Sequence, residues 1–382
     1  MTSTLDCIVI GAGPSGLAVG ACLKHHGVNA VILERETSVA PNWRKHYDRL
    51  HLHTFRDLSA LPFKKWRKGT PAYPSREQVV EYMQEYADEQ KLRIEFGVEI
   101  THVERDGEEW VLTAGTNSWR ARALVIATGY NRTPFSPRFN DQEQFEGEII
   151  HSSRYRSGAP YQGKNVLVVG SGNSGAEIAI DLFEHGAKPS ICIRGPVHVA
   201  PREVHGIPAQ IASLVISRLP RRLGDALALS TSKLHYGDLS AYGIVRPEIG
   251  PISSIADLGR VPMVDIGTIE LIKGGHLRVV PGIESFDRTG IKFTDGRRFD
   301  FDAVVLATGY DATIEEFMPE AASLIDERGY PKLHDTQSSF PGPYFIGFGN
   351  PPTGQIHAIN RQSQRIAKEI HKQLANAVKR AS

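Results

Sequence analysis

The sequence predicts an α/β protein built from two similar units. A short apolar strand runs into a glycine-rich turn twice, first at Gly11-Ala12-Gly13-Pro14-Ser15-Gly16 and again at Gly170-Ser171-Gly172-Asn173-Ser174-Gly175. A strand with one shared ending follows in each half, Ala127-Thr128-Gly129-Tyr130 and then Ala307-Thr308-Gly309-Tyr310. The repetition of both motifs in the same order indicates two copies of one supersecondary plan, each a Rossmann-like dinucleotide-binding domain.

In the first unit, the run Ile8-Val9-Ile10 is typical of a strand buried on both faces, and a helical pattern follows the turn. Gly11 would make the tight turn, Gly13 would let a pyrophosphate approach the backbone, and Gly16 would let the helix pack on the strand. The free N–H groups and the positive dipole end of the helix would then bind the phosphates. The alternative is a glycine turn that joins a strand to a helix and binds nothing.

The residue at the end of the next strand distinguishes the two ligands. In the first unit it is Glu34, 23 positions after Gly11, where a carboxylate accepts hydrogen bonds from a free ribose 2′-hydroxyl. In the second it is Arg194, 24 positions after Gly170, where a guanidinium suits a 2′-phosphate. We predict NAD or FAD in the first site and NADPH in the second. A chain that holds FAD and NADPH passes a hydride from the nicotinamide to the flavin.

Composition limits the partners. The chain has 382 residues, enough for two cores, and a formal net charge of +1, which gives no electrostatic reason to expect nucleic acid or an anionic membrane. No signal peptide precedes the first strand and no apolar run could span a bilayer, so we expect a cytoplasmic protein. The three cysteines are scattered with no C-x-x-C pair, which argues against disulfide reduction. A small-molecule substrate and O₂ are the expected partners, and a homodimer stays open.

The pattern divides the chain into two domains. We predict a discontinuous FAD-binding domain at 1–150 and 300–382, and an NADPH-binding domain at 151–299 with a helical insertion at about 201–262. Ser75 and Gln78 predict a capping box at the start of a helix that ends near Gln90. Further predicted elements are hairpins at 110–121 and from 293, helices near 207–219 and 223–233, a strand at 344–350, and a final helix from Gln355. The insertion either lines a substrate cavity or only packs.

An aromatic and histidine-rich segment follows the first unit's second strand. His51 and His53 alternate as on a strand, and no carboxylate or cysteine completes a metal ligand set. We interpret the segment as flavin packing, with metal binding as the alternative. Beyond the two glycine turns and the two strand endings, the residues predicted to bind cofactor are Glu34, Arg35, Trp43, Arg44, Leu50, His51, Ile100, Arg194, Asn350 and Gln355.

The pattern Phe145-x-Gly147-x-x-x-His151-x-x-x-Tyr155 lies before the second glycine turn. It resembles the identifying pattern of flavin-containing monooxygenases, and Tyr155 resembles their version rather than that of type I Baeyer–Villiger enzymes. Longer phrases resemble the plant YUCCA-type indole-3-pyruvate monooxygenases: Arg49-Leu50-His51-Leu52-His53, His151-Ser152-Ser153, Val197-His198-Val199-Ala200-Pro201-Arg202-Glu203, Tyr242-Gly243-Ile244-Val245-Arg246-Pro247 and Val264-Asp265-Ile266-Gly267-Thr268.

The resemblance implies a flavoprotein oxidoreductase of the glutathione-reductase-like fold. It implies that FAD reduced by NADPH reacts with O₂ to form a flavin C4a-(hydro)peroxide, and that one oxygen atom enters a small organic substrate. The chemistry is then either oxidative decarboxylation of an aryl 2-oxo acid such as indole-3-pyruvate, or S- or N-oxygenation. An NAD(P)H oxidase, or a flavoprotein reductase that donates electrons to a carrier, is the alternative.

One position departs from the animal-type members of the family. Their active-site asparagine falls, by the spacing from Tyr47 to Leu61-Pro62, on His53 of this sequence. We therefore predict His53 as the catalytic residue, with an imidazole that hydrogen-bonds the reacting oxygen or the nicotinamide ribose. We interpret His151 of the motif as a residue that orders the linker rather than as a general base.

Overall fold

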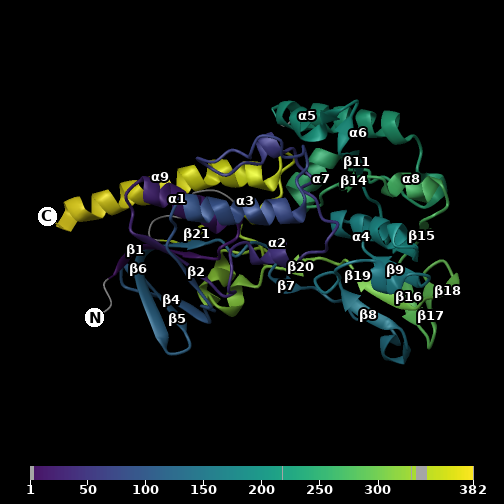
Figure 1. Cartoon of the computed structure of the whole chain (residues 1–382), viewed down its shortest axis with the longest axis horizontal. Helices are drawn as coiled ribbons and strands as arrows, with labels where there is room; N and C mark the ends of the chain where they lie inside the picture. The colour runs from purple at the N-terminus through teal and green to yellow at the C-terminus, as the bar shows by residue number, and fades with distance from the viewer. Residues whose placement is uncertain (1–3, 217, 328, 333–341, 382) are drawn as a thin grey trace.

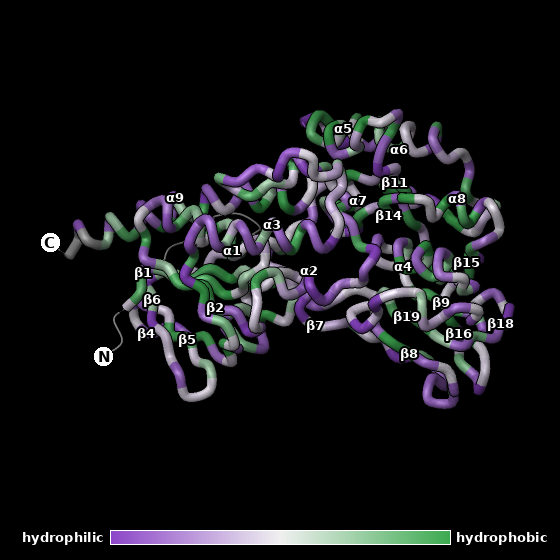
Figure 2. The backbone as a smooth tube through the Cα atoms, viewed as in Figure 1, coloured by the Kyte–Doolittle hydropathy of each residue, from purple (hydrophilic) through white to green (hydrophobic). Residues whose placement is uncertain are grey.

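A computed structural model describes residues 4–216, 218–327, 329–332 and 342–381 of the chain. Two sheet-centred units lie side by side, and the chain passes from the first to the second and back (Figure 1). The strands at the centre of each unit carry the hydrophobic residues, as Figure 2 shows. The fold is therefore the predicted α/β arrangement with two units.

The first sheet has seven strands in the order β3-β2-β1-β6-β5-β4, with β21 paired to β6. Those parallel to β1 are β2, β3, β6 and β21, while β4 and β5 add an antiparallel edge. The strands are β1 (Leu5–Ile10), β2 (Ala30–Glu34), β3 (Ile94–Phe96), β4 (His102–Asp106), β5 (Glu109–Ala114), β6 (Asn117–Ile126) and β21 (Tyr344–Phe345). The predicted hairpin arm and the strand before Ala127 are thus one continuous strand, and the strand predicted at 344–350 has only two residues.

Helices cover one face of this sheet. These are α1 (Pro14–His25), α3 (Arg76–Glu89) and the long C-terminal α9 (Gln355–Ala381). Cys7 and Val9 of β1 pack against them, while Ile8 and Ile10 pack on the opposite face with residues of the hairpin and of the turn around Phe317. The capping box of α3 is confirmed, because Ser75 Oγ accepts from the Gln78 N–H and the Gln78 side chain accepts from the Ser75 N–H.

The second sheet is parallel throughout, in the order β15-β10-β9-β19-β8. Its strands are β8 (Glu148–His151), β9 (Asn165–Val169), β10 (Lys188–Cys192), β15 (Arg278–Val280) and β19 (Ala303–Leu306). Residues of α4 (Asn173–Glu184) and α8 (Thr268–Lys273) belong to the core on one face. The antiparallel strands β16 (Ile283–Phe286), β17 (Gly290–Phe293) and β18 (Arg298–Asp300) pack on the other, and the predicted Asp295-Gly296 turn joins the last two.

Strand pairing shows which sheet contains the strands nearest the predicted limits at 150/151 and 299/300. β8 pairs with β19, and β19 pairs with β9, so both strands belong to the second sheet. The sequence could not indicate this pairing, because a buried parallel strand is an apolar run wherever it lies. Which sheet it joins depends on contacts far away in the sequence.

The insertion lies over the second unit near the boundary with the first (Figure 1). It contains the two predicted helices, α5 (Ala209–Ile216) and α6 (Arg221–Tyr236), and a third that the sequence did not indicate, α7 (Pro251–Leu258). Short strands frame it: β11 (Val199–Pro201), β12 (Glu203–Val204), β13 (Ile207–Pro208) and β14 (Met263–Asp265). The remaining elements are α2 (Pro41–Lys45), β7 (Thr133–Pro134) and β20 (Tyr310–Asp311), besides short 3₁₀ turns. No helix of the described ranges has the length and apolar character needed to cross a bilayer.

Candidate active site

A cavity of about 800 Å³ runs from the first glycine turn to the helices of the insertion. It has the size and partly apolar lining of a ligand site. The predicted residues that line it are Gly11, Gly13, Pro14, Ser15, Glu34, Arg35, Trp43, Leu50, His51, His53, Ile100, Ala127, Thr128, Gly129, Asn173, Ser174, Asn350 and Gln355. The predicted residues outside its lining are Gly16, Arg44, Gly170, Ser171, Gly172, Gly175, Arg194, Ala307, Thr308, Gly309 and Tyr310. Of the second glycine turn, only Asn173 and Ser174, which lie in the first turn of the helix α4, line this cavity.

The first glycine turn has the geometry of a phosphate cradle. Gly11 has φ +105°, and a Cβ there would lie 2.8 Å from the Ala127 carbonyl oxygen. A Cβ at Gly16 would lie 1.8 Å from the Gly11 carbonyl oxygen, so the helix packs on the turn too closely for any side chain. Gly13 has no heavy atom within 4 Å of a Cβ position. Close approach by a ligand is possible at Gly13 alone.

The second turn repeats this geometry. A Cβ would lie 2.3 Å from the Ala307 carbonyl oxygen at Gly170, which has φ +125°, and 2.0 Å from the Gly170 carbonyl oxygen at Gly175. Gly172 is again open. Neither α1 nor α4 has a side-chain N-cap hydrogen bond, in contrast to α3. The first N–H groups of α1 and α4 are thus left for an anionic ligand, as the glycine pattern predicts.

Glu34 ends β2 at the cavity with its carboxylate fixed from both sides. Oε2 accepts from the Ala12 N–H at 2.6 Å, and Oε1 accepts from the Glu36 N–H at 3.0 Å. The residue is 5% exposed. Because a carboxylate offers about four acceptor positions, these two bonds leave acceptors for ribose hydroxyls. In the second unit, Arg194 follows β10 and is exposed, so its guanidinium is accessible to a phosphate group.

The C-terminal segment returns to the first turn. Gln355 opens α9, and its side-chain amide donates to the Gly347 carbonyl oxygen at 2.8 Å. Gly347 in turn lies against Ser15, because a Cβ there would be 2.0 Å from Ser15 Oγ. The final helix therefore adds its N-terminal end to the cavity beside the phosphate cradle.

Packing explains the first half of the Phe145–Tyr155 motif. The Phe145 ring lies on Gly147, where a Cβ would come within 2.5 Å of the ring and 2.8 Å of the Asp302 carbonyl oxygen. It also contacts Phe286 edge-on, with ring centroids 5.4 Å apart. Only glycine fits between the ring and the backbone at this entrance to β8.

His151 connects the end of β8 to the second strand ending. Its Nδ1 accepts from the Ser153 N–H at 3.1 Å, so the ring hydrogen lies on Nε2, which donates to the Gly309 carbonyl oxygen at 3.0 Å. The ring packs edge-on against Tyr310 at 5.0 Å. Burial lowers the pKa of His151 and favours this neutral form. These contacts are those of a residue that orders the linker.

Tyr155, the last residue of the motif, fixes α4. Its hydroxyl donates to Asp181 Oδ2 at 2.6 Å, and the Gly158 N–H donates to the same oxygen at 2.8 Å. The Tyr155 ring also meets the Tyr47 ring edge-on, with centroids 6.4 Å apart. Tyr47 belongs to the first unit, so this aromatic pair joins the two units.

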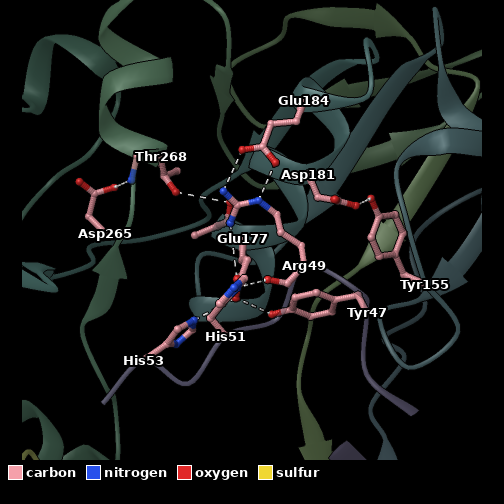
Figure 3. A network of polar contacts seen from close by, with 12 residues as sticks. Tyr47, Arg49, His51, His53, Tyr155, Glu177, Asp181, Glu184, Asp265 and Thr268 are labelled. Carbon is pink, nitrogen blue, oxygen red and sulfur yellow. Dashed lines mark hydrogen bonds and ion pairs between the residues drawn. The ribbon is translucent and has the colours of Figure 1, made fainter. Parts of the chain in front are cut away.

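His53 lies in the cavity wall and is held by a residue that the sequence analysis missed. His53 Nε2 lies 2.9 Å from Oε2 of Glu177, a residue of α4 that is 1% exposed. The Tyr47 hydroxyl donates to the same oxygen at 3.0 Å, and Arg49 Nη1 lies 3.5 Å from Oε1 (Figure 3). A carboxylate within the apolar stretch 176–180 was the available signal.

The described residues include neither a cysteine pair suited to disulfide chemistry nor a cluster suited to bind a metal ion. Cys7, Cys22 and Cys192 are unpaired and buried, and burial raises the pKa values of Cys22 and Cys192 to about 11, so neither thiol ionises readily. No cluster of three His, Cys, Asp or Glu side chains with metal-binding geometry occurs within the part of the chain that the structure describes.

Comparison with known proteins defines the class. The profile of the family "Pyridine nucleotide-disulphide oxidoreductase" matches residues 8–211. Two solved structures share the fold. The flavin-containing monooxygenase from Stenotrophomonas maltophilia has a TM-score of 0.75 at 21% identity, covering 98% of this chain and 100% of that one. The OTEMO complex with FAD and NADP has 0.73 at 17%, covering 99% and 87%. The chain has the fold of two-domain flavoproteins of the pyridine nucleotide-disulphide oxidoreductase type.

Sequence relatives define the family. Indole-3-pyruvate monooxygenase YUCCA1 of Oryza sativa subsp. japonica is 38% identical over 95% of this chain and 91% of the relative. YUCCA6 of Arabidopsis thaliana is 36% identical over 96% and 90%. The chain belongs to the family of YUCCA-type flavin-containing monooxygenases. It is an FAD- and NADPH-dependent monooxygenase that acts on a small molecule and O₂, and the predicted oxidase and reductase alternatives are set aside.

Proposed function

We propose that the substrate is an aryl 2-oxo acid such as indole-3-pyruvate, which the enzyme decarboxylates oxidatively. The supporting observation is the end of the cavity at the insertion, whose lining combines apolar residues of three helices with Arg202. Ala212 and Ile216 of α5, Leu229 of α6, and Ile252 and Ile255 of α7 line that end. A flat aryl ring fits such a wall, because burying its apolar surface is favourable.

Arg202 supplies the charge. Its backbone is held on both sides, since its N–H donates to the Asp265 carbonyl oxygen at 3.4 Å and its carbonyl oxygen accepts from the Ala209 N–H at 2.9 Å. Its guanidinium lies 4.2 Å from the centroid of the Tyr73 ring and, among the described residues, pairs with no carboxylate. An arginine among the lining residues is suited to bind a carboxylate with charge-assisted hydrogen bonds. A neutral sulfide or a cationic amine would gain nothing from it.

The proposed reaction consumes one 2-oxo acid, O₂, NADPH and a proton, and yields the carboxylic acid one carbon shorter, CO₂, NADP⁺ and water. FAD, when bound, takes the electrons from NADPH and activates O₂. The chain would hold FAD with Gly13, the N-terminus of α1 and Glu34, and NADPH with Gly172, the N-terminus of α4 and Arg194. We propose the corresponding division into an FAD unit and an NADPH unit, with β8 and β19 in the second.

His53 is the proposed catalytic residue, because it is an imidazole in the wall of the cavity between the two units. A hydrogen bond between the His53 ring and a protonated oxygen at the reacting centre would keep oxygen transfer ahead of H₂O₂ release. His53→Ala should therefore oxidise NADPH with release of H₂O₂. Unchanged coupling in this variant would reject the role.

The proposed substrate is tested by product analysis with indole-3-pyruvate, an aryl methyl sulfide and a tertiary amine in parallel. Only the first should give a product stoichiometric with NADPH, and CO₂ should be released with it. Arg202→Met should raise the KM for the 2-oxo acid by about 10- to 100-fold, the effect of losing one charge-assisted bond, with the KM for NADPH unchanged. Arg194→Ala is the matched control, with the opposite pattern. A sulfoxide or N-oxide as the main product would favour S- or N-oxygenation.

We also propose a cytoplasmic enzyme with no membrane or nucleic-acid partner, supported by the formal net charge of +1. Cell fractionation tests the location. Sedimentation of the purified protein tests whether it forms a homodimer.

A further inference from the structure

We infer that Glu177, a residue of the second unit, positions His53 of the first. It holds the imidazole with its hydrogen on Nε2, and Nδ1 is left as the ring nitrogen available to a molecule in the cavity. The inference deepens the proposed function, since it rests on His53 as the residue that meets the reacting oxygen.

Glu177 is surrounded by donors rather than by solvent. Its carboxylate is 1% exposed and has three partners from one segment of the first unit, Tyr47, Arg49 and His53. Figure 3 shows the three side chains converging on it. A buried carboxylate without such partners would be very costly. Glu177 therefore relies on donors from the first unit, and the positions of Tyr47, Arg49 and His53 rely in turn on Glu177.

The identity of the partners fixes the direction of the hydrogen bonds. Burial and the neighbouring Glu177 charge raise the pKa of Tyr47 well above its usual range, so the tyrosine stays protonated and donates. Arg49 can only donate, and it also forms two bonds to Glu184, at 2.7 and 2.9 Å. An ionised carboxylate can only accept. The His53 nitrogen at 2.9 Å from Glu177 must then carry hydrogen, and that nitrogen is Nε2.

The position of Glu177 on α4 links its contact with His53 to the second glycine turn. It lies on α4, three residues after Ser174, whose helix begins at the second glycine turn and lines the cavity. The helix that is proposed to bind NADPH thus also sets the orientation of His53. In this arrangement the two units must be correctly docked before Nδ1 of His53 is presented.

The direct test is the tautomer of His53 in the FAD-loaded enzyme, observed by ¹⁵N–¹H correlation of protein labelled at histidine ring nitrogens. The His53 signals are identified by their loss in His53→Gln. The wild-type enzyme should show hydrogen on Nε2 and a bare Nδ1. Hydrogen on Nδ1, alone or on both nitrogens, would overturn the inference, and this measurement needs no variant of Glu177.

The variant test compares Glu177→Gln with Glu184→Gln. Both remove one charge from α4 beside Arg49, but Glu184 has a half-exposed side chain and pairs with Arg49. Glu177→Gln should mix the two tautomers, because an amide can either donate to Nε2 or accept from it. Glu184→Gln should keep the wild-type pattern. A pattern that is unchanged in Glu177→Gln, or disturbed equally in both, would reject positioning by Glu177.

A second readout separates this inference from the role proposed for His53. The H₂O₂ released per NADPH should rise roughly tenfold in Glu177→Gln, the factor for one net hydrogen bond, and not further in the double variant with His53→Ala. If His53→Ala stays coupled while the tautomer still depends on Glu177, the role of His53 fails and the positioning stands. If His53→Ala uncouples and Glu177→Gln changes neither readout, the positioning fails alone.

Discussion

Substitution by alanine should affect different properties at Gly13 and at Gly16. At Gly16 it should lower the stability of the fold, and at Gly13 it should lower the affinity for FAD. At Gly16 the added Cβ would lie 1.8 Å from the Gly11 carbonyl oxygen and 3.0 Å from its carbon. Both atoms are backbone, so α1 has to move away from the turn by roughly 1 Å in a close-packed core. At Gly13 the added Cβ meets no heavy atom within 4 Å, and φ −75°, ψ −177° is an extended conformation that alanine adopts.

The expected free energies follow from these contacts. Overpacking costs about 1–3 kcal/mol or more, against a gain of about 0.5–1 kcal/mol from placing alanine instead of glycine in a helix. Gly16→Ala should therefore lower the free energy of unfolding of the FAD-free protein by about 1–2 kcal/mol. Gly13→Ala should change it by less than about 0.5 kcal/mol, because a weaker N-cap and a stiffer unfolded chain offset each other.

The affinity for FAD should be affected mainly by the substitution at Gly13. In Gly13→Ala the methyl group stands where a pyrophosphate has to approach, so about 1.5–3 kcal/mol of charge-assisted bonding is lost and the Kd rises by about 10- to 100-fold. Urea unfolding of the FAD-free variants and a flavin-fluorescence titration measure the two quantities. Gly13→Ala with unaltered FAD affinity, or Gly16→Ala with unaltered stability, would refute the assignment of the turn. Gly172 and Gly175 form a matched pair, with NADPH as the ligand.

Two further predictions concern Arg194 and His46. Arg194→Ala should raise the KM for NADPH by about 10- to 100-fold and barely change that for NADH, because only NADPH has the 2′-phosphate; steady-state kinetics with both coenzymes decides, and an equal effect would reject the assignment. Burial, with Arg156 nearby, lowers the pKa of His46 from 6.5 to about 4. Between pH 4 and pH 6.5, His46 is therefore protonated more in the unfolded chain than in the folded one. The free energy of unfolding should then decrease as the pH falls from 6.5 toward 4, by up to about 3 kcal/mol. His46→Asn should make urea midpoints less dependent on pH across this window, and an unchanged dependence would contradict the cause.

Local patterns made much of the fold predictable. Each role of a glycine in the turns depends on residues within a few positions or on the adjoining strand, and the capping box of α3 spans only Ser75 to Gln78. Glu34 and Arg194 could be located because Glu34 ends the strand after the first glycine turn and Arg194 lies two residues beyond the strand after the second. The helix α7, in a segment rich in proline and serine, lacked such a signal, since its apolar residues face the cavity rather than a sheet.

What could not be predicted depends on contacts between distant segments. β8 and β19 lie more than 150 positions apart and yet pair side by side. Glu177 contacts His53, which lies 124 positions earlier in the sequence, and no sequence pattern around either residue indicates the other. A buried carboxylate within α4 was visible in the sequence as an exception to an apolar face. Its partners, however, come from the other unit and are known only once the units are placed.

The Phe145–Tyr155 motif gains a physical role from this placement. His151 holds the second strand ending through the Gly309 carbonyl oxygen, and Tyr155 holds Asp181 on α4. Asp181 lies four residues after Glu177, so both side chains project from the same side of one helix. The motif fixes the linker to α4 one turn away from the residue that contacts His53. A pattern with no atom in the cavity lining can therefore govern how the two units meet around the site.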